Sequence, residues 1–305
     1  ITVRDLNLYY GENHALKDVN MNIRENCVTA FIGPSGCGKS TAGRTILRLH
    51  DITDGKVIFK GEDLAKCSKK EMRAKRLQMQ MVFQDPYASL NPRMTVGNII
   101  GEALLDHKLM SKAEAREKVL ETMEICGLPT YYINRYPHEF SGGQRQRIGI
   151  ARSLILNPEL IVCDEPVSAL DVSIQSQIIN LLGDLQERNN FSYIFISHDL
   201  SVVEYISNRV AVMYLGNIVE MADKNEIFDN PLHPYTKALM SAIPVPDPTR
   251  KRDRIILSGD LPSPSNPPSG CKFRTRCPYA TEKCAQEAPE YRDVGNEHFV
   301  ACHYV

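Results

Sequence analysis

The stretch GPSGCGKST, from Gly33 to Thr41, combines glycines with a lysine and hydroxyl side chains. It fits the pattern G-x-x-x-x-G-K-[ST], in which successive backbone N–H groups wrap phosphate groups. In this pattern Lys39 reaches the β and γ phosphates, and the Ser40 hydroxyl binds Mg²⁺. An apolar run ending at Ile32 precedes it and a helical pattern follows, which is the strand–loop–helix context of a phosphate-binding loop (P-loop). The residues expected around the nucleotide are Gly33, Pro34, Ser35, Gly36, Cys37, Gly38, Lys39, Ser40 and Thr41.

Four further residues follow apolar runs that predict strands. Asp164 ends the run LIVCD, where it can hold the metal through water, and Glu165 comes next and can polarise an attacking water. His198 follows the run FSYIFIS, and Gln84 ends the run LQMQMVFQ. Alone, an acidic pair is a common surface feature and a single histidine is usually structural. After a P-loop they predict a hydrolytic site, with Gln84 sensing Mg²⁺ and His198 bonding the γ phosphate.

A second stretch, FSGGQ from Phe140 to Gln144, also has the features of an anion site. Gly142 and Gly143 permit close backbone approach, and a helix beginning near Ser141 presents its positive end. The segment lacks the lysine and metal ligand that a complete phosphate site needs. We therefore expect it to be half a site.

The elements that must position these residues alternate along the chain. Strand patterns fill residues 1–33, 54–61, 77–84, 159–166 and 191–197, and helical patterns cover residues 39–49, 95–126 and 173–188. Ser111 with Glu114 predicts a capping box inside the second helical stretch. This alternation argues for an α/β fold with a mainly parallel sheet covered on both faces.

Composition narrows the functional classes. The 305 residues carry a formal net charge of −1, with 43% hydrophobic and 24% charged residues, which is ordinary for a globular protein and gives no sign of nucleic-acid binding. No apolar run approaches the roughly 18 residues needed to cross a bilayer. Membrane association would therefore have to run through a partner.

The chain changes character near residue 243. Seven of its eighteen prolines lie between Pro244 and Pro268, so that stretch cannot be regular helix or sheet. Four of the nine cysteines follow, at intervals C-x5-C, C-x6-C and C-x17-C. In a reducing compartment such a group favours a metal over disulfides, and four widely spaced thiolates are compatible with an iron–sulfur cluster or with zinc. These cysteines are Cys271, Cys277, Cys284 and Cys302. His298 and His303 are spare ligands or plain surface residues.

The order P-loop, Gln84, FSGGQ, LIVCDEP, SALD (Ser168 to Asp171) and His198 resembles the ATPase subunit of an ABC transporter. The resemblance covers about 240 residues and implies a P-loop ABC-type ATPase domain with a mixed sheet and a helical subdomain. We expect this domain over residues 1–243, with the helical subdomain over about 85–157. Residues 244–305 are expected to form a small, irregular C-terminal extension: a proline-rich arm followed by the cysteine cluster.

The resemblance also implies roles that the residues alone do not. Tyr10, before Gly11, would stack on adenine. Two ATPase domains would meet head to tail, and the Ser141–Gln144 loop of one would complete the nucleotide site of the other, with Asp171 at the same boundary. Glu165 would be the catalytic base, assisted by Lys39, Gln84 and His198.

From about Leu47 onward the chain looks like the ATPases of bacterial oligopeptide and dipeptide importers. The supporting stretches are MVFQDPYASLNPRMTVGNII, HPYTKALMSAIPVPDP and LPSPSNPPSGCKFRTRCPYA. The first forty-odd residues are closer to the ATPase of phosphate importers. A nickel or phosphate importer, and a soluble ABC-type ATPase, are the alternatives. The latter usually has a long coiled-coil insertion or two motif sets, and this chain has neither.

The importer resemblance implies partners and cofactors. It implies ATP, Mg²⁺ and a [4Fe–4S] cluster on the four tail cysteines, with Zn²⁺ as the alternative. The partners would be a second ATPase subunit, two transmembrane permease subunits and, through the complex, an extracytoplasmic peptide-binding protein, with no nucleic acid. The chain would lie at the cytoplasmic face of the bacterial inner membrane, and residues 85–97 would contact the permease.

Overall fold

A computed structural model describes residues 1–243 and 254–305. Two units divide the chain: residues 1–66 with 195–305, and residues 67–194. The strand β8 (Ser192–Ile196) spans the boundary between them. The domain boundary expected near residue 243 stays a prediction, and the first prolines of the expected arm, Pro244, Pro246 and Pro248, lie outside the described residues.

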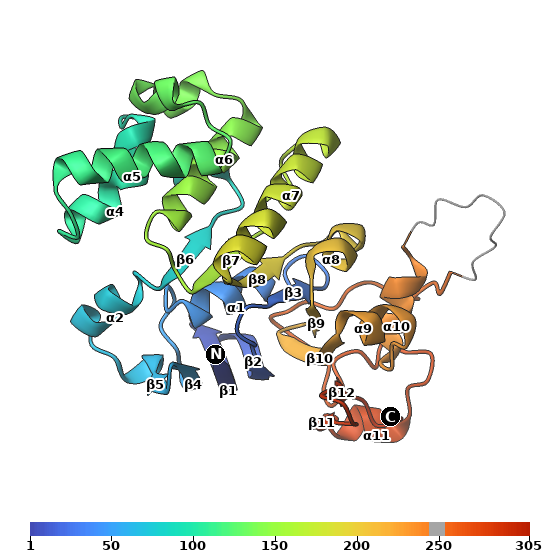
Figure 1. The fold of residues 1–305 in the computed structure, drawn as a ribbon. Coiled ribbons are helices and arrows are strands. Elements are labelled where there is room, and N and C mark those ends of the chain that lie inside the picture. The colour runs from blue at the N-terminus through green and yellow to red at the C-terminus, as the bar shows by residue number, and fades with distance from the viewer. Residues whose placement is uncertain (244–253) are drawn as a thin grey trace. The chain divides into compact units, whose positions relative to one another are not determined.

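The first unit contains two sheets (Figure 1). In one, the strand order is β2-β1-β4-β5, and all its pairs are antiparallel. In the other, β3 and β9 are parallel, while β9, β10, β12 and β11 continue as antiparallel neighbours. The strands are β1 (Thr2–Tyr10), β2 (Asn13–Asn22), β3 (Val28–Ile32), β4 (Asp54–Phe59), β5 (Glu62–Asp63), β9 (Arg209–Tyr214), β10 (Asn217–Asp223), β11 (Tyr291–Asp293) and β12 (Phe299–Ala301).

The helices of this unit are short. They are α1 (Lys39–Ile46), η1 (Leu64–Lys66), α8 (Leu200–Ile206), α9 (Lys224–Asp229), α10 (Pro234–Ser241) and α11 (Glu282–Gln286). All five residues of β3 are buried, which explains the continuous apolar run VTAFI. The core beside it includes Val210, Val212 and Tyr214 of β9.

The second unit is mostly helical (Figure 1). Its only described strands outside β8 are the parallel pair β6 (Met79–Val82) and β7 (Leu160–Asp164). The helices α4, α5 and α6 pack on one another. Its helices are α2 (Lys69–Lys75), α3 (Pro86–Ser89), α4 (Val96–Asp106), α5 (Lys112–Ile125), η2 (Thr130–Asn134), η3 (Pro137–Glu139), α6 (Gly142–Leu154) and α7 (Val172–Asn189).

Local chemistry sets several of these helix ends. The expected capping box of α5 is present: the Glu114 carboxylate accepts from the Ser111 N–H at 2.8 Å, and the Ser111 hydroxyl accepts from the Glu114 N–H at 3.4 Å. The long helix α7 ends where Asn190 adopts a left-handed conformation, φ 55°. Within the described ranges, no helix combines the length and apolar character needed to cross a bilayer.

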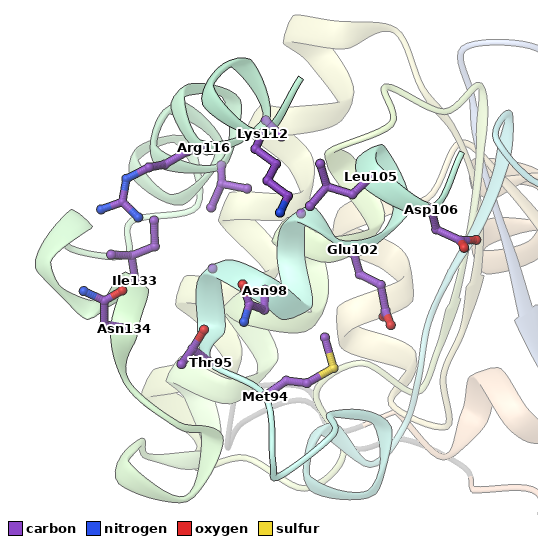
Figure 2. Close-up of a pocket in the computed structure, with 14 residues that line it drawn as sticks. Met94, Thr95, Asn98, Glu102, Leu105, Asp106, Lys112, Arg116, Ile133 and Asn134 are labelled. Carbon is purple, nitrogen blue, oxygen red and sulfur yellow. The ribbon is translucent and has the colours of Figure 1, made fainter. Parts of the chain in front are cut away.

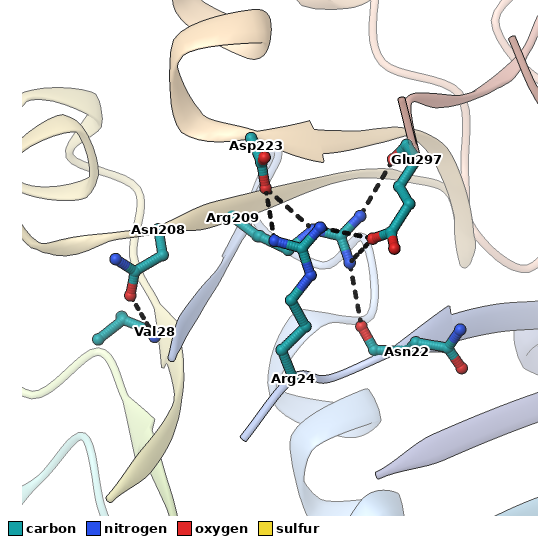
Figure 3. Close-up of polar contacts among 7 residues, drawn as sticks. All are labelled: Asn22, Arg24, Val28, Asn208, Arg209, Asp223 and Glu297. Carbon is teal, nitrogen blue, oxygen red and sulfur yellow. Dashed lines mark hydrogen bonds and ion pairs between the residues drawn. The ribbon is translucent and has the colours of Figure 1, made fainter. Parts of the chain in front are cut away.

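The C-terminal residues are bound to the first unit by a charge network (Figure 3). The buried Arg209 lies 3.5 Å from the Asp223 carboxylate and 3.6 Å from that of Glu297. Arg24 pairs with the same two carboxylates at 3.1 and 2.5 Å. Arg209 also donates to the backbone carbonyls of Asn22 and Glu297. This network joins β2, β9, β10 and the β11–β12 loop. The C-terminal tail (residues 254–305) is therefore bound to these strands by ion pairs and hydrogen bonds.

Candidate active site

The P-loop lies between β3 and α1, as expected. Gly33, Gly36 and Gly38 have φ values of 147°, 76° and 103°, a region that side chains rarely allow. Lys39 is 5% exposed, and its ammonium donates to the carbonyls of Gly33 at 2.8 Å and Pro34 at 3.0 Å. The loop is thus wrapped around its own cation, which is the charge that a polyphosphate requires.

Two other predicted residues belong to the same unit as the P-loop. Tyr10 is 47% exposed and meets His50 edge-on, whereas the neighbouring Tyr9 is already stacked on His14 at 4.0 Å. The stacking of Tyr10 on adenine stays a prediction. His198 is exposed two residues beyond β8, and the adjoining Ser197 N–H donates to the Phe31 carbonyl of β3 at 3.3 Å. His198 accordingly follows a strand next to the one that leads into the P-loop.

The second unit brings the other catalytic candidates together. β6 and β7 are parallel, so Gln84 and Glu165 emerge at the same edge. The Gln84 side-chain amide donates to the Glu165 carboxylate at 3.0 Å. Asp164 ends β7 and is fully buried. Glu165 has φ 45°, a left-handed conformation that costs energy in a non-glycine residue and is typical of functional sites.

The FSGGQ loop begins α6 through a capping box. The Ser141 hydroxyl accepts from the Gln144 N–H at 3.4 Å, and the Gln144 side chain accepts from the Ser141 N–H at 3.0 Å. Gly142 lies against Leu170, and a Cβ at Gly143 would clash with Ile174. The two glycines therefore allow α6 to pack closely on the segment around Asp171. Asp171 occupies the N-cap position of α7 without a side-chain capping hydrogen bond, and it is exposed, as Ser141 is.

The four tail cysteines lie within electrostatic reach of one another. Burial raises the pKa of the Cys271 thiol, and the thiols of Cys284, Cys277 and Cys302 raise it further. The Cys271 N–H donates to the Cys284 carbonyl at 2.8 Å. All four are free thiols, and among the described residues no group of three or more Cys, His, Asp or Glu side chains is arranged to hold a metal ion.

His298 is not the surface residue or spare ligand that the sequence suggests. It is buried, and its Nε2 lies 2.7 Å from the carboxylate of Glu220, which is itself fully buried. A buried carboxylate needs a partner, and His298 supplies one from the tail. The half-buried His303 instead contacts the Glu287 carbonyl at 3.1 Å.

Comparison with known proteins decides the family. Residues 16–168 match the family model "ABC transporter", and residues 219–284 match "Oligopeptide/dipeptide transporter, C-terminal region". The chain belongs to the ABC transporter family. It is therefore an ABC-type ATPase, and the expected α/β fold of that type is confirmed. The resemblance to ATPases of the oligopeptide/dipeptide type is confirmed as well.

Curated relatives of this ABC ATPase cover almost all of it. The chain is 54% identical over 299 residues to the oligopeptide transport ATP-binding protein AppF of Bacillus subtilis, which covers 96% of this chain and 90% of the relative. It is 54% identical over 291 residues to OppF of Haemophilus influenzae, covering 94% and 88%. Among solved structures, the dimeric ATP-binding cassette MJ0796 bound to ADP and Pi is 30% identical, with a TM-score of 0.67 over 73% of this chain and 98% of that one.

One part of the ABC ATPase site was not predicted from the sequence. The turn Leu215–Gly216 between β9 and β10 packs on the P-loop, where the Gly216 N–H donates to the Cys37 carbonyl at 2.9 Å. The signal in the sequence is weak: a single glycine after an apolar strand indicates a turn but not what the turn contacts.

Proposed function

We propose that this chain is the ATP-hydrolysing subunit of a bacterial importer of dipeptides or oligopeptides. The observation that supports it most is the succession of two family matches in one chain: an ABC transporter match over residues 16–168, and an oligopeptide/dipeptide transporter match over residues 219–284. Curated relatives named as oligopeptide transport proteins cover both regions. The subunit would be bound peripherally at the cytoplasmic face of the inner membrane and would hydrolyse ATP there.

The residues described above would divide the work of hydrolysis. Tyr10 would stack on adenine, and the backbone of the P-loop with Lys39 would hold the phosphates. Glu165 would take a proton from the attacking water. The amide of Gln84, which already donates a hydrogen bond to the Glu165 carboxylate, would hold that carboxylate in place. His198 would bond the γ phosphate.

The side chains proposed to bind Mg²⁺ carry the donor atoms that this ion prefers. A hydroxyl on Ser40, an amide oxygen on Gln84 and a carboxylate on Asp164 are oxygen ligands, which this hard cation prefers, with Asp164 acting through water. When bound, the ion would neutralise charge on the phosphate oxygens. Asp164 ends β7 and is fully buried, at the position proposed for the water-mediated ligand.

A complete site would need two ATPase subunits. The Ser141–Gln144 loop offers a helix N-terminus and close-packed glycines but no lysine, so we propose that it closes over nucleotide held by the P-loop of the partner. Asp171, packed beside that loop, would lie at the same boundary. The solved relative MJ0796 is dimeric in its ADP and Pi complex. The partner is a second copy of this chain or a sister subunit.

A pocket in the second unit is our candidate for the permease contact. It has a volume of about 570 Å³ and is lined by α4, α5, η2 and the end of the 85–97 segment (Figure 2). Met94, Leu105 and Val119 supply apolar surface, while Glu102 and Arg116 bring charge. An apolar groove with a charged rim fits one short amphipathic helix, and we propose a cytoplasmic helix of the permease as its occupant.

We expect Leu105→Asp to remove this contact. Leu105 lines the pocket and is 42% exposed, so the substitution places a charge against the incoming helix at little cost to the fold. Recovery of the permease with the tagged ATPase from detergent-solubilised membranes should fall about tenfold or more. Leu109→Asp is the matched control, because Leu109 is similarly exposed but does not line the pocket. Equal permease recovery with both variants would contradict the assignment.

For the tail we propose a [4Fe–4S] cluster bound by Cys271, Cys277, Cys284 and Cys302. The donor chemistry supports it, because four free thiols lie in one short stretch of the tail, two of them buried, and thiolates are the usual ligands of such clusters. Anaerobically purified protein should contain iron and acid-labile sulfide and absorb near 400 nm, an order-of-magnitude expectation for thiolate-bound iron. Cys277→Ser should remove the iron, the sulfide and the absorption, whereas Cys67→Ser should leave all three unchanged. One zinc per chain, or metal-free thiols, would overturn the cluster.

Uptake by the assembled importer tests the function itself. The complex that co-purifies with this chain, reconstituted in vesicles with its binding protein, should accumulate labelled dipeptide or oligopeptide when ATP is supplied. Accumulation of nickel or phosphate without peptide would assign the alternative substrate. If no permease co-purifies at all, the chain would instead be a soluble ABC ATPase.

A further inference from the structure

The P-loop rests on the end of a strand hairpin in its own unit. The Gly216 N–H donates to the Cys37 carbonyl at 2.9 Å, and a Cβ at Gly33 would clash with the Met213 carbonyl oxygen. The hairpin β9–β10 and the phosphate-binding backbone are therefore in direct contact. A shift of the turn Leu215–Gly216 would move the groups that bind phosphate.

Lys17 holds this turn against β2. Its side chain is 7% exposed, and its ammonium donates to the carbonyls of His14 at 2.5 Å and Leu215 at 3.1 Å. Its own N–H donates to the Gly216 carbonyl at 2.9 Å. Gly216 has φ 87°, and a Cβ there would lie 2.5 Å from the Ala15 carbonyl oxygen. The turn is thus packed without spare room between β2 and the P-loop.

The other side of the turn packs on the tail. Tyr214, the last residue of β9, meets the ring of Phe273 edge-on at 5.4 Å, and Tyr235 lies at the same centroid distance from Phe273. Phe273 is 1% exposed, although the Cys271–Cys277 segment around it is irregular. Burial raises the pKa of the Tyr214 hydroxyl, and the nearby Arg276 guanidinium offsets part of that shift. The cysteine segment thereby inserts one aromatic side chain into the core directly behind the turn.

The charges around Lys17 agree with this placement. Burial lowers the pKa of Lys17, and the nearby positive charge of Lys272 lowers it further. Lys272 is the residue before Phe273. The tail segment therefore lies near both residues that flank the turn, Lys17 and Tyr214.

We propose that the Cys271–Cys277 segment is a positioning element of the nucleotide site. Phe273 supports Tyr214, Tyr214 fixes the turn Leu215–Gly216, and the turn fixes the P-loop backbone. Nucleotide affinity then depends on the tail, and any change at the tail thiols that moves Phe273 changes that affinity. Because binding linkage is reciprocal, nucleotide on the P-loop also stabilises the tail segment. The inference rests on the P-loop being the nucleotide site, as proposed above.

Phe273→Leu in the full chain tests the first half of this inference. It removes ring contacts behind Tyr214, and the Kd for MgATP should rise about fivefold or more, with a smaller effect on kcat at saturating ATP. Phe299→Leu is the matched control: Phe299 is a tail aromatic stacked on Tyr291, away from the turn, and its replacement should leave Kd unchanged. Equal Kd values for wild type and a folded Phe273→Leu would overturn the proposal.

Amide hydrogen exchange tests the second half without any substitution. A non-hydrolysable ATP analogue should slow exchange in residues 271–277 and 215–217, while β11 (Tyr291–Asp293) serves as the tail control. Protection of the P-loop with no change in residues 271–277 would contradict the inference. Lys39→Ala distinguishes a failure of the nucleotide-site assignment from a failure of the proposed role of the tail. If it binds ATP normally, the nucleotide site is misassigned; if it loses ATP while Phe273→Leu does not, only the role of the tail fails.

Discussion

Replacing Glu165 with Gln should lower steady-state ATP hydrolysis by about 10² to 10⁴-fold, the usual contribution of a general base. The amide keeps the size of the side chain and can still hydrogen-bond Gln84, but it cannot take a proton from water. Binding energy from both halves of the shared site would remain, so the variant should accumulate as an ATP-bound dimer. Phosphate release and gel filtration with ATP measure the two effects.

Glu187→Gln provides the control for this substitution. Glu187 is an exposed residue of α7, so the same chemical change there should leave hydrolysis within the wild-type range. Rapid turnover by Glu165→Gln would show that another group activates the water. Slow turnover with no dimer would separate the catalytic role of Glu165 from the proposed closure.

Ser141→Arg should abolish hydrolysis while the isolated subunit still binds ATP with near-normal affinity. Ser141 is exposed at the start of α6, and in the proposed head-to-tail dimer an arginine there would obstruct the partner's nucleotide. Loss of a preorganised donor site typically costs about 10² to 10³-fold in rate, and steric obstruction adds to that. Equilibrium binding of labelled ATP and phosphate release measure the two properties.

The chain offers a closely matched control for the lost helix cap. Ser111 caps α5 with the same reciprocal hydrogen bonds that Ser141 makes at α6. Ser111→Arg should therefore cost a similar stability, about 1 kcal/mol, but leave hydrolysis intact. If the two variants lost activity equally, the effect of Ser141→Arg would be one of stability. Loss of ATP binding by Ser141→Arg would place the loop in its own chain's site.

Features set by local chemistry could be predicted from the sequence. The P-loop lies between β3 and α1 because its glycines and flanking apolar run dictate that turn. The capping boxes of α5 and α6 follow from serine with Glu or Gln three residues later. The proximity of Gln84 and Glu165 agrees with two apolar strands ending at one sheet edge, but the hydrogen bond between them was not predicted, and β6 ends two residues before Gln84.

Features set by distant packing could not. Lys17 and Leu215 are 198 residues apart in the sequence, and Glu220 and His298 are 78 apart. Neither pair has a local pattern, because each depends on which strands become neighbours in the sheet. The buried position of Phe273 likewise has no signal in an irregular, cysteine-rich segment. Of these features, the Glu220–His298 pair and the buried Phe273 attach the C-terminal tail to the strands of the first unit.

Complementation between two inactive variants tests the shared site most directly. Lys39→Ala lacks a working P-loop and Ser141→Arg lacks a working closing loop, but a mixed dimer contains one site in which both halves are intact. Under conditions in which the subunits associate, the mixture should hydrolyse ATP clearly faster than the two variants measured separately. Activity no greater than their sum, with mixed dimers present, would contradict the account.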